Sequence, residues 1–230
     1  MPTVAELYKL LREEAAPHIE RRKQKTYGPD GRRWGPHGEE AGAEGQIALA
    51  IWHGGRPDFR NFIYGDGGVD VYLLLLIDGV PRWVAIDAKG VWKTPRELPI
   101  PSQGDFKVNP RTIYVQSYRP PGQNENANAI EKGPWPLNGW IWGHEVMKYP
   151  IKPYAGNDRL THVVPSLAAS SHLHPMDELK AIYLDQWRWR GCQQEPAVYC
   201  SEPKSEPKME SVHNPFRGTV AGATSWGSMS

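Results

Sequence analysis

The alternation of hydrophobic and polar residues is most regular in two neighbouring runs, 69–77 and 82–89, and it predicts two β-strands. The pair Asp78-Gly79 between them is typical of a tight turn, so the strands are expected to form a hairpin. Another strand is predicted at 111–118, with weaker patterns at 139–147 and 161–165.

Apolar residues spaced three and four positions apart predict helices in three other segments. These segments are residues 3–25, 39–52 and 176–190. In the first, Leu7, Leu10 and Leu11 form one apolar stripe. Two stretches rich in Gly and Pro, 26–38 and 119–138, are predicted to be loops.

The length of the chain, 230 residues, suits one main domain with a sizeable core. Residues 1–200 are predicted to form that domain. Beyond Cys200 the chain is rich in Ser, Gly and Pro, and Ser-Glu-Pro-Lys occurs twice in tandem. Residues 201–230 are therefore predicted to be a flexible tail.

Three charged residues are expected on one face of the hairpin. Side chains alternate across a strand, so Asp87 and Lys89 point away from the apolar row of their own strand, as Asp70 does on the other. A two-residue turn places Asp70 directly across from Asp87. A four-residue loop, which Pro81 would favour because it cannot donate to a ladder, places Asp70 across from Lys89. A three-residue loop would place Asp70 and Asp87 on opposite faces, and it would also place the apolar rows of the two strands on different faces.

Two carboxylates facing each other across strands, with Cβ atoms about 4.5–5.5 Å apart, repel and require a compensating charge. A hard cation such as Mg²⁺ takes carboxylate oxygens and shares its shell with phosphate. Lys89 would then lie beside the metal, where its charge could hold the attacking water or help to deprotonate it. The pattern predicts a divalent-metal site that can share its ligands with a phosphate and activate a water.

Glu44 occupies an unusual position for a surface acid. With Ile47, Ala48 and Ile51 it follows the i, i+3, i+4, i+7 spacing, so it should point toward whatever the helix packs on. From a helix laid across the sheet, Glu44 could complete the metal shell or orient the water.

These residues resemble the motif of the PD-(D/E)XK nuclease superfamily. The resemblance is carried by Gly68-Val69-Asp70, then sixteen residues, then Asp87-Ala88-Lys89, and it spans roughly residues 38–120. Val69 stands where the motif has proline. The resemblance implies an α/β (α+β) fold with a central mixed β-sheet flanked by helices, the restriction-endonuclease-like core.

The resemblance also implies the roles of individual residues. Asp70 would be the pivotal metal ligand, Asp87 a second ligand and the Ala88 carbonyl a third. Lys89 would activate water or stabilise the transition state, and Glu44 would be the helical acid. The implied cofactor is Mg²⁺, with Mn²⁺ as a substitute, and the implied partner is DNA.

A DNA endonuclease of restriction, homing or structure-selective type is therefore the expected function. An exonuclease is an alternative, although Gln116 and Tyr118 match the Gln/Tyr element of that branch only loosely and with different spacing. A non-catalytic DNA-binding protein of phage or mobile-element type on the same fold is a second alternative. A sugar-binding module that uses the tryptophans is a third.

Local patches must supply any affinity for DNA, because 27 Lys and Arg against 26 Asp and Glu give a net charge of only +1. The candidate nucleic-acid-binding residues are Arg21, Arg22, Lys23, Arg32 and Arg33, to which Lys9 and Arg12 could add. Candidates for stacking on unpaired bases are Trp34, Trp92, Trp135, Trp140 and Trp142, whose alternative role is to fill the margin of the core.

Other features of the sequence bear on location and partners. No apolar run approaches the ~20 residues needed to span a bilayer, so a cytoplasmic protein without a membrane partner is expected. Cys192 and Cys200 are expected to be reduced thiols. His172-x-His174, next to Pro175, favours a loop over a metal site. A homodimer would suit concerted cutting of two strands, but the sequence has no clear interface stripe.

Overall fold

The computed structural model describes residues 2–24, 38–59, 69–92, 96–102, 108–120, 133–154, 157–167 and 170–188. The chain divides into two units, Met1–Tyr199 and Cys200–Ser230, and all described residues belong to the first. The predicted tail, 201–230, and the two cysteines lie outside the described residues. Among the described helices, none combines the length and apolar character needed to cross a bilayer.

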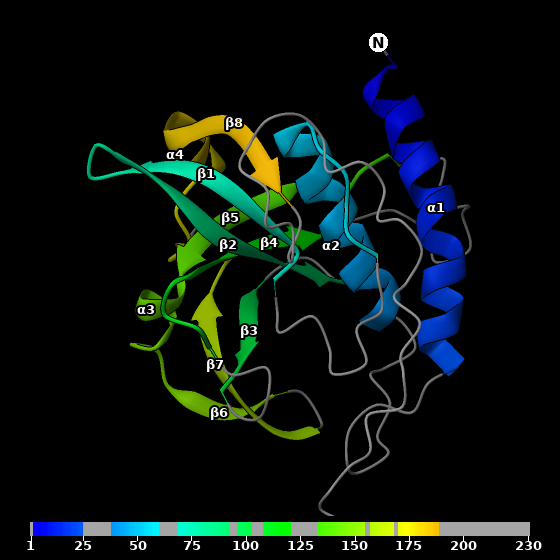
Figure 1. The fold of residues 1–230 in the computed structure, drawn as a ribbon. Helices are drawn as coiled ribbons and strands as arrows, with labels where there is room; N and C mark the ends of the chain where they lie inside the picture. Colours follow the sequence, from blue (N-terminus) through cyan, green and yellow to red (C-terminus); the bar gives the residue numbers. More distant parts are fainter. Residues whose placement is uncertain are drawn as a thin grey trace, which may run out of the picture. The chain divides into compact units, whose positions relative to one another are not determined.

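Along the described part of the chain, two helices are followed by a run of strands, into which two short helices are inserted (Figure 1). The helices are α1 (Val4–Gln24), α2 (Gly38–His53), α3 (Gly143–Val146) and α4 (Met176–Ile182). The strands are β1 (Val71–Ile77), β2 (Val80–Val91), β3 (Glu97–Pro101), β4 (Thr112–Tyr118), β5 (Leu137–Trp142), β6 (Ile151–Tyr154), β7 (Asn157–Pro165) and β8 (Tyr183–Arg188).

The central element is a five-stranded sheet with the order β5-β4-β2-β1-β8. It is mixed, because β2 and β4 run parallel while the other neighbours run antiparallel. A second sheet has the order β3-β7-β6. The expectation of a central mixed sheet flanked by helices is thus confirmed at this level of detail.

Helix α2 and the second sheet cover opposite faces of the central sheet. Helix α2 packs on one face, where Leu49 joins a buried cluster with Leu73 and Ile86, and α1 packs on α2 beyond it (Figure 1). On the other face, Tyr114 and Ile141 share a buried cluster with residues of β3 and β7. The central sheet is therefore covered on both faces at β2, β4 and β5.

The β1–β2 hairpin has the two-residue turn. Ile77 pairs with Val80, and Val71 pairs with Ile86. Asp78 and Gly79 have φ of 51° and 75°, and positive φ at both central residues is what a type I′ turn requires. The alternative four-residue loop, expected because Pro81 cannot donate to a ladder, does not form, and Pro81 fits the two-residue turn. Hydrogen-bonded pairs alternate along an antiparallel ladder, so the residue after the closing pair directs its nitrogen away from β1.

Helix α2 approaches the sheet closely at two glycines. A Cβ added to Gly90 of β2 would overlap the backbone carbonyl of Ala41, and a Cβ added to Gly45 would lie 3.0 Å from the nitrogen of Gly90. Only glycine at position 90 allows the helix backbone to rest directly on the strand. This contact sets the height of α2 above the Asp87-Ala88-Lys89 segment.

The predicted helix at 176–190 is wrong at residues 183–188, and residues 189 and 190 lie outside the described part. Tyr183 has extended dihedral angles, and residues 183–188 form β8 at the edge of the sheet beside β1. The Tyr183 side chain is buried, stacks on Trp52 and donates a hydrogen bond to the carbonyl of His53. Covering the outer edge of β1 outweighs the local helical pattern.

Two smaller predictions need correction. The strand predicted at 139–147 is β5 over 137–142, followed by the short helix α3, whose first turn is capped by Glu145 through the Trp142 nitrogen at 3.0 Å. Leu10 is 57% exposed and not part of the buried stripe of α1. That stripe consists instead of Tyr8, Leu11, Ala15 and Ile19.

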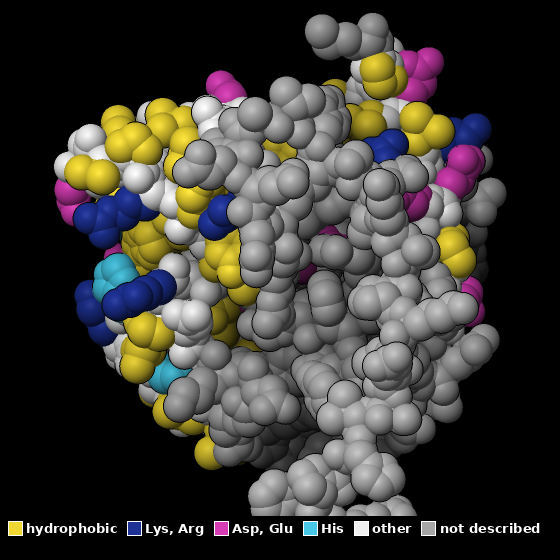
Figure 2. All heavy atoms as spheres, in the orientation of Figure 1, with side chains coloured by type: hydrophobic (Ala, Val, Ile, Leu, Met, Phe, Trp, Pro, Cys, Tyr) yellow, Lys and Arg dark blue, Asp and Glu magenta, His cyan; other side chains and the backbone are white. Residues whose placement is uncertain are grey.

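The tip of the β1–β2 hairpin extends beyond the core. Leu76 and Val80 at the tip are exposed. In the space-filling view, hydrophobic side chains lie next to Lys or Arg side chains over this hairpin (Figure 2). The hairpin therefore offers an amphipathic surface, unlike its open end, where the acidic residues are buried.

We expect Gly90→Ala to lower the free energy of unfolding by at least about 2 kcal/mol, because α2 must move away from β2 to accommodate the new methyl group. Gly42→Ala is the matched control on the same helix. A Cβ at Gly42 meets nothing within 4 Å, and alanine there should stabilise the helix by up to about 1 kcal/mol. Urea unfolding of both variants measures the difference, and equal stability would contradict the close approach.

Candidate active site

Asp70 lies at the open end of the hairpin, immediately before β1. It is 7% exposed, and both of its carboxylate oxygens accept hydrogen bonds. The Ala88 nitrogen donates to Oδ2 at 2.6 Å, and Gln46 Nε2 of α2 donates to Oδ1 at 2.5 Å. Asp70 also donates its own backbone N–H to the carbonyl of Ile86 at 2.9 Å. The acid is therefore fixed against both β2 and α2.

Asp87 and Lys89 lie on the adjacent strand β2. The ladder between β1 and β2 ends at the Val71–Ile86 pair, and the Asp70 N–H binds the Ile86 carbonyl, so the regular pairing that would place Asp70 directly across from Asp87 does not continue outward. Asp87 is 4% exposed, and its Oδ2 lies 2.7 Å from Lys89 Nζ. The two carboxylates and the ammonium group are thus brought to the same end of the hairpin.

The Ala88 carbonyl faces this end of the hairpin as well. In a strand, the N–H and C=O of one residue point to the same neighbour, and the Ala88 N–H points to Asp70. Strand β1 begins only at Val71, so the carbonyl of Ala88 faces the edge where Asp70 stands. Backbone and side chains together present several oxygen atoms there.

Gln46 belongs to this group, although it is absent from the sequence prediction. It is 6% exposed and holds Asp70 through Nε2, while its Oε1 is buried without a hydrogen-bond partner among the described residues. A buried amide oxygen without a partner costs free energy, so the site has capacity for one more cation or donor. A polar amide in the otherwise apolar run Gly45 to Ile51 was the signal in the sequence.

Glu44 makes contacts in a different direction. Its carboxylate accepts hydrogen bonds from the Tyr8 hydroxyl at 3.2 and 3.1 Å, and Arg12 Nε lies 2.7 Å from its Oε1. The Arg12 Nε–H is not aligned for a hydrogen bond, so this contact is an ion pair without one. Arg12 also binds Glu40 through Nη2 at 2.6 Å. The contacts of Glu44 thus join α2 to α1, and its catalytic role stays a prediction.

Burial dominates the electrostatics of Glu44. It raises the pKa of this carboxyl to about 7, even though the positive charge of Arg12 and the Tyr8 hydroxyl favour ionisation. Burial and the charge of Glu44 in turn raise the pKa of Tyr8. The helical acid therefore changes its protonation state near neutral pH.

The residues at the hairpin end fit a magnesium ion, the cofactor that the resemblance implies. Asp70, Asp87, the Ala88 carbonyl and Gln46 Oε1 are all hard oxygen donors, the type that Mg²⁺ prefers. Among the described residues, no three His, Cys, Asp or Glu side chains converge as metal ligands. The proposed set has only two acidic side chains and takes its other oxygens from an amide and the backbone.

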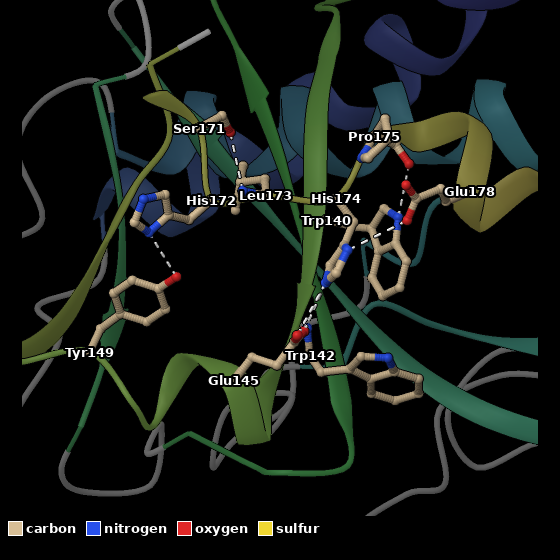
Figure 3. Close-up of polar contacts among 10 residues, drawn as sticks. All are labelled: Trp140, Trp142, Glu145, Tyr149, Ser171, His172, Leu173, His174, Pro175 and Glu178. Carbon is tan, nitrogen blue, oxygen red and sulfur yellow. Dashed lines mark hydrogen bonds and ion pairs between the residues drawn. The ribbon is translucent and has the colours of Figure 1, made fainter. Parts of the chain in front are cut away.

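The histidines of the His172-x-His174 motif point to different partners (Figure 3). The Tyr149 hydroxyl lies 3.0 Å from His172 Nδ1, whereas His174 Nε2 lies 3.1 Å from Glu145 Oε2. His174 also stacks on Trp140, with ring centroids 4.5 Å apart. These two side chains do not share a metal site, and His174 fastens the segment before α4 to β5 and α3.

The structure answers only part of the prediction for nucleic-acid-binding residues. The side chains of Arg21, Arg22 and Lys23 and the whole of Arg32 and Arg33 lie outside the described part. Arg12 is committed to Glu40 and Glu44. Of the tryptophans, Trp135 and Trp140 are buried, Trp92 and Trp142 are half-buried, and Trp34 is outside the described residues.

Gln116 also has a structural place. It is fully buried in β4, donates to the Glu97 carbonyl at 3.0 Å and accepts from Asn138 at 2.8 Å. These bonds tie the central sheet to β3.

Comparison of the chain with protein-family models, curated proteins and solved structures finds no match.

Replacing Glu44 by Gln should change how stability depends on pH. The native pKa of about 7 lies above the unfolded value of 4.5, so the native state binds the proton more tightly. The contribution of Glu44 to stability is thus present below pH 4.5 and is lost as pH rises toward 7. Relative to Glu44→Gln, the wild-type free energy of unfolding should fall by up to about 3 kcal/mol across this range.

Urea unfolding at a series of pH values measures this difference. Glu14→Gln, an exposed position of α1, is the matched control and should keep the wild-type pH dependence. Parallel curves for wild type and Glu44→Gln would show that burial does not raise the pKa of Glu44.

Proposed function

We propose that this chain is a magnesium-dependent nuclease that hydrolyses DNA phosphodiester bonds as an endonuclease. One observation carries the proposal. Two carboxylates, Asp70 and Asp87, are buried at the open end of an antiparallel hairpin, and an ammonium group lies 2.7 Å from the second. Buried carboxylate oxygens beside a lysine are the kind of donors that a divalent cation such as Mg²⁺ takes.

The chain's own residues would do three things in this reaction. Asp70 and Asp87, with the Ala88 carbonyl and Gln46 Oε1, would hold the cation, which when bound supplies positive charge against the charge that develops on the phosphoryl group. Gln46 and the Ala88 N–H fix the orientation of Asp70. Lys89 would donate hydrogen bonds to a phosphate oxygen or to the attacking water.

Two features of the tryptophans weigh against the sugar-binding alternative. A sugar platform needs exposed rings in a common plane. Trp92 and Trp135 meet at 63° and Trp140 and Trp142 at 78°, which are edge-to-face arrangements of core packing. One ring of each pair is buried.

Cleavage of supercoiled plasmid and of a branched DNA, each with Mg²⁺, Mn²⁺ or EDTA, tests the proposal. The wild type should cut only with a divalent metal. Asp87→Asn and Lys89→Ala should each lower the cleavage rate about 10²–10⁴-fold, because each removes a charge that acts at the reacting group. The rate of product formation on gels measures the loss.

Asp78→Asn is the matched control for Asp87→Asn, since it removes one negative charge from the same hairpin. Asparagine tolerates the positive φ of position 78, so this variant should fold and cut like the wild type. If no metal supports cutting of either DNA, or if Asp87→Asn cuts at the wild-type rate, the proposed function is wrong.

A further inference from the structure

Arg188, at the end of β8, lies across two aromatic rings of the hairpin. Its guanidinium carbon is 4.5 Å from the ring centroid of Trp83 and 5.4 Å from that of Tyr72. Arg188 pairs with Tyr72 in the ladder, and Trp83 is the diagonal neighbour of Tyr72 on β2. All three side chains are half-buried and therefore partly open to solvent. We call this group the Arg188 platform.

The charge of Arg188 is not neutralised by the described part of the chain. Some other described cations have carboxylate partners, such as Arg12 with Glu40 and Lys180 with Asp185. Among the described residues, Arg188 has aromatic contacts and no carboxylate within ion-pair distance. An arginine held by ring faces keeps its N–H donors available for an anion, and its planar fork suits phosphate oxygens.

The Arg188 platform lies on the same face of β2 as Asp87 and Lys89. Positions 83, 85, 87 and 89 alternate with the core positions, so Trp83, Ala85, Asp87 and Lys89 share one side of the strand. Along this row of β2, Ala85 is the residue between Trp83 and Asp87, and its side chain is small. The row thus leads from the aromatic rings under Arg188 to the candidate active site.

We propose that the Arg188 platform is a binding subsite for a backbone phosphate of the DNA strand whose scissile phosphate lies at Asp87 and Lys89. The platform would hold the strand to one side of the cleavage point. Because the guanidinium covers the Trp83 ring and the ligand is a phosphate, the contact carries no sequence preference. This inference rests on the proposed function for the identity of its ligand.

The spacing limits which phosphate it is. Four residue steps of β2 separate Trp83 from Asp87, about 13 Å at ~3.3 Å per residue. The ~3.4 Å rise per nucleotide of B-form DNA is measured along the helix axis, and the phosphates follow a longer path around it, so the bound phosphate would be fewer than about four nucleotides from the cleaved bond. A strand that ends at the cleaved bond on that side would not reach the subsite.

DNA binding in EDTA, measured by fluorescence anisotropy over a range of salt concentrations, tests the subsite without cleavage. Arg188→Ala should weaken binding about tenfold and lower the slope of log affinity against log salt by about 0.9, the loss of one phosphate contact. Arg82→Ala is the matched control. Arg82 is exposed on the other face of the same strand and should keep the wild-type slope.

Trp83→Leu provides a second variant that leaves every charge in place. It removes the ring that holds Arg188, so it should weaken binding by less than Arg188→Ala and leave the salt slope nearer to the wild-type value. Thermal unfolding of each variant shows whether the fold is retained. Oligonucleotides with abasic positions should show the same dependence on Arg188 as intact ones.

Wild-type affinity and salt slope in Arg188→Ala would overturn the subsite, and so would an equal loss in Arg82→Ala. Loss of the Arg188 dependence on abasic DNA would mean that the guanidinium stacks on a base, which would also overturn the phosphate assignment. Failure of the proposed function gives a different result, because a chain that binds DNA through Arg188 in EDTA but never cuts retains the subsite and loses only the chemistry.

Discussion

The candidate site depends on the register of β1 against β2, which the turn at Asp78 and Gly79 sets. Both turn residues have positive φ, and the two-residue loop pairs Ile77 with Val80. Counting outward from that pair reaches Val71 and Ile86, the last pair of the ladder, with Asp70 next to it at the open end. A slip of one residue would expose the apolar row of β1. Core packing and site geometry therefore select the same register.

Helix α2 links that hairpin to the rest of the domain through side chains that point in opposite directions from the helix. Residues two apart on a helix point about 200° apart, so Gln46 reaches Asp70 while Glu44 reaches Tyr8 and Arg12 of α1. The helix can serve both sides only because Gly90 lets it lie directly on β2. A helix held farther from the sheet would leave Gln46 out of reach of Asp70.

The distribution of cations matters more than their number in a chain with a net charge of +1. Arg12 forms ion pairs with Glu40 and Glu44 between α1 and α2, and Lys89 forms an ion pair with Asp87. Arg188 is held by aromatic rings on the face that carries Asp87 and Lys89. In the proposed nuclease, the substrate strand would follow the cations of this face, and the long-range field of the protein would contribute little.

The sequence by itself determined the local features. Strand period, turn chemistry and the alternation of side chains fixed the hairpin, its buried rows and the grouping of Asp70, Asp87 and Lys89, because each depends on residues a few positions apart. It also gave most of α1, α2 and β4. Where such signals compete with distant contacts, the sequence was misleading, as at 183–188, where a helical pattern became the edge strand β8.

Only the tertiary structure decided which partners meet across the fold. Where α1 packs decides that Glu44 contacts Arg12. The height of α2 above β2 decides that Gln46 hydrogen-bonds to Asp70, and the pairing of β8 with β1 decides the position of Arg188. These contacts join residues from 24 to more than 100 positions apart, and no local period encodes them. Their physical cause is the burial of apolar surface between elements, which the order of residues along the chain does not specify.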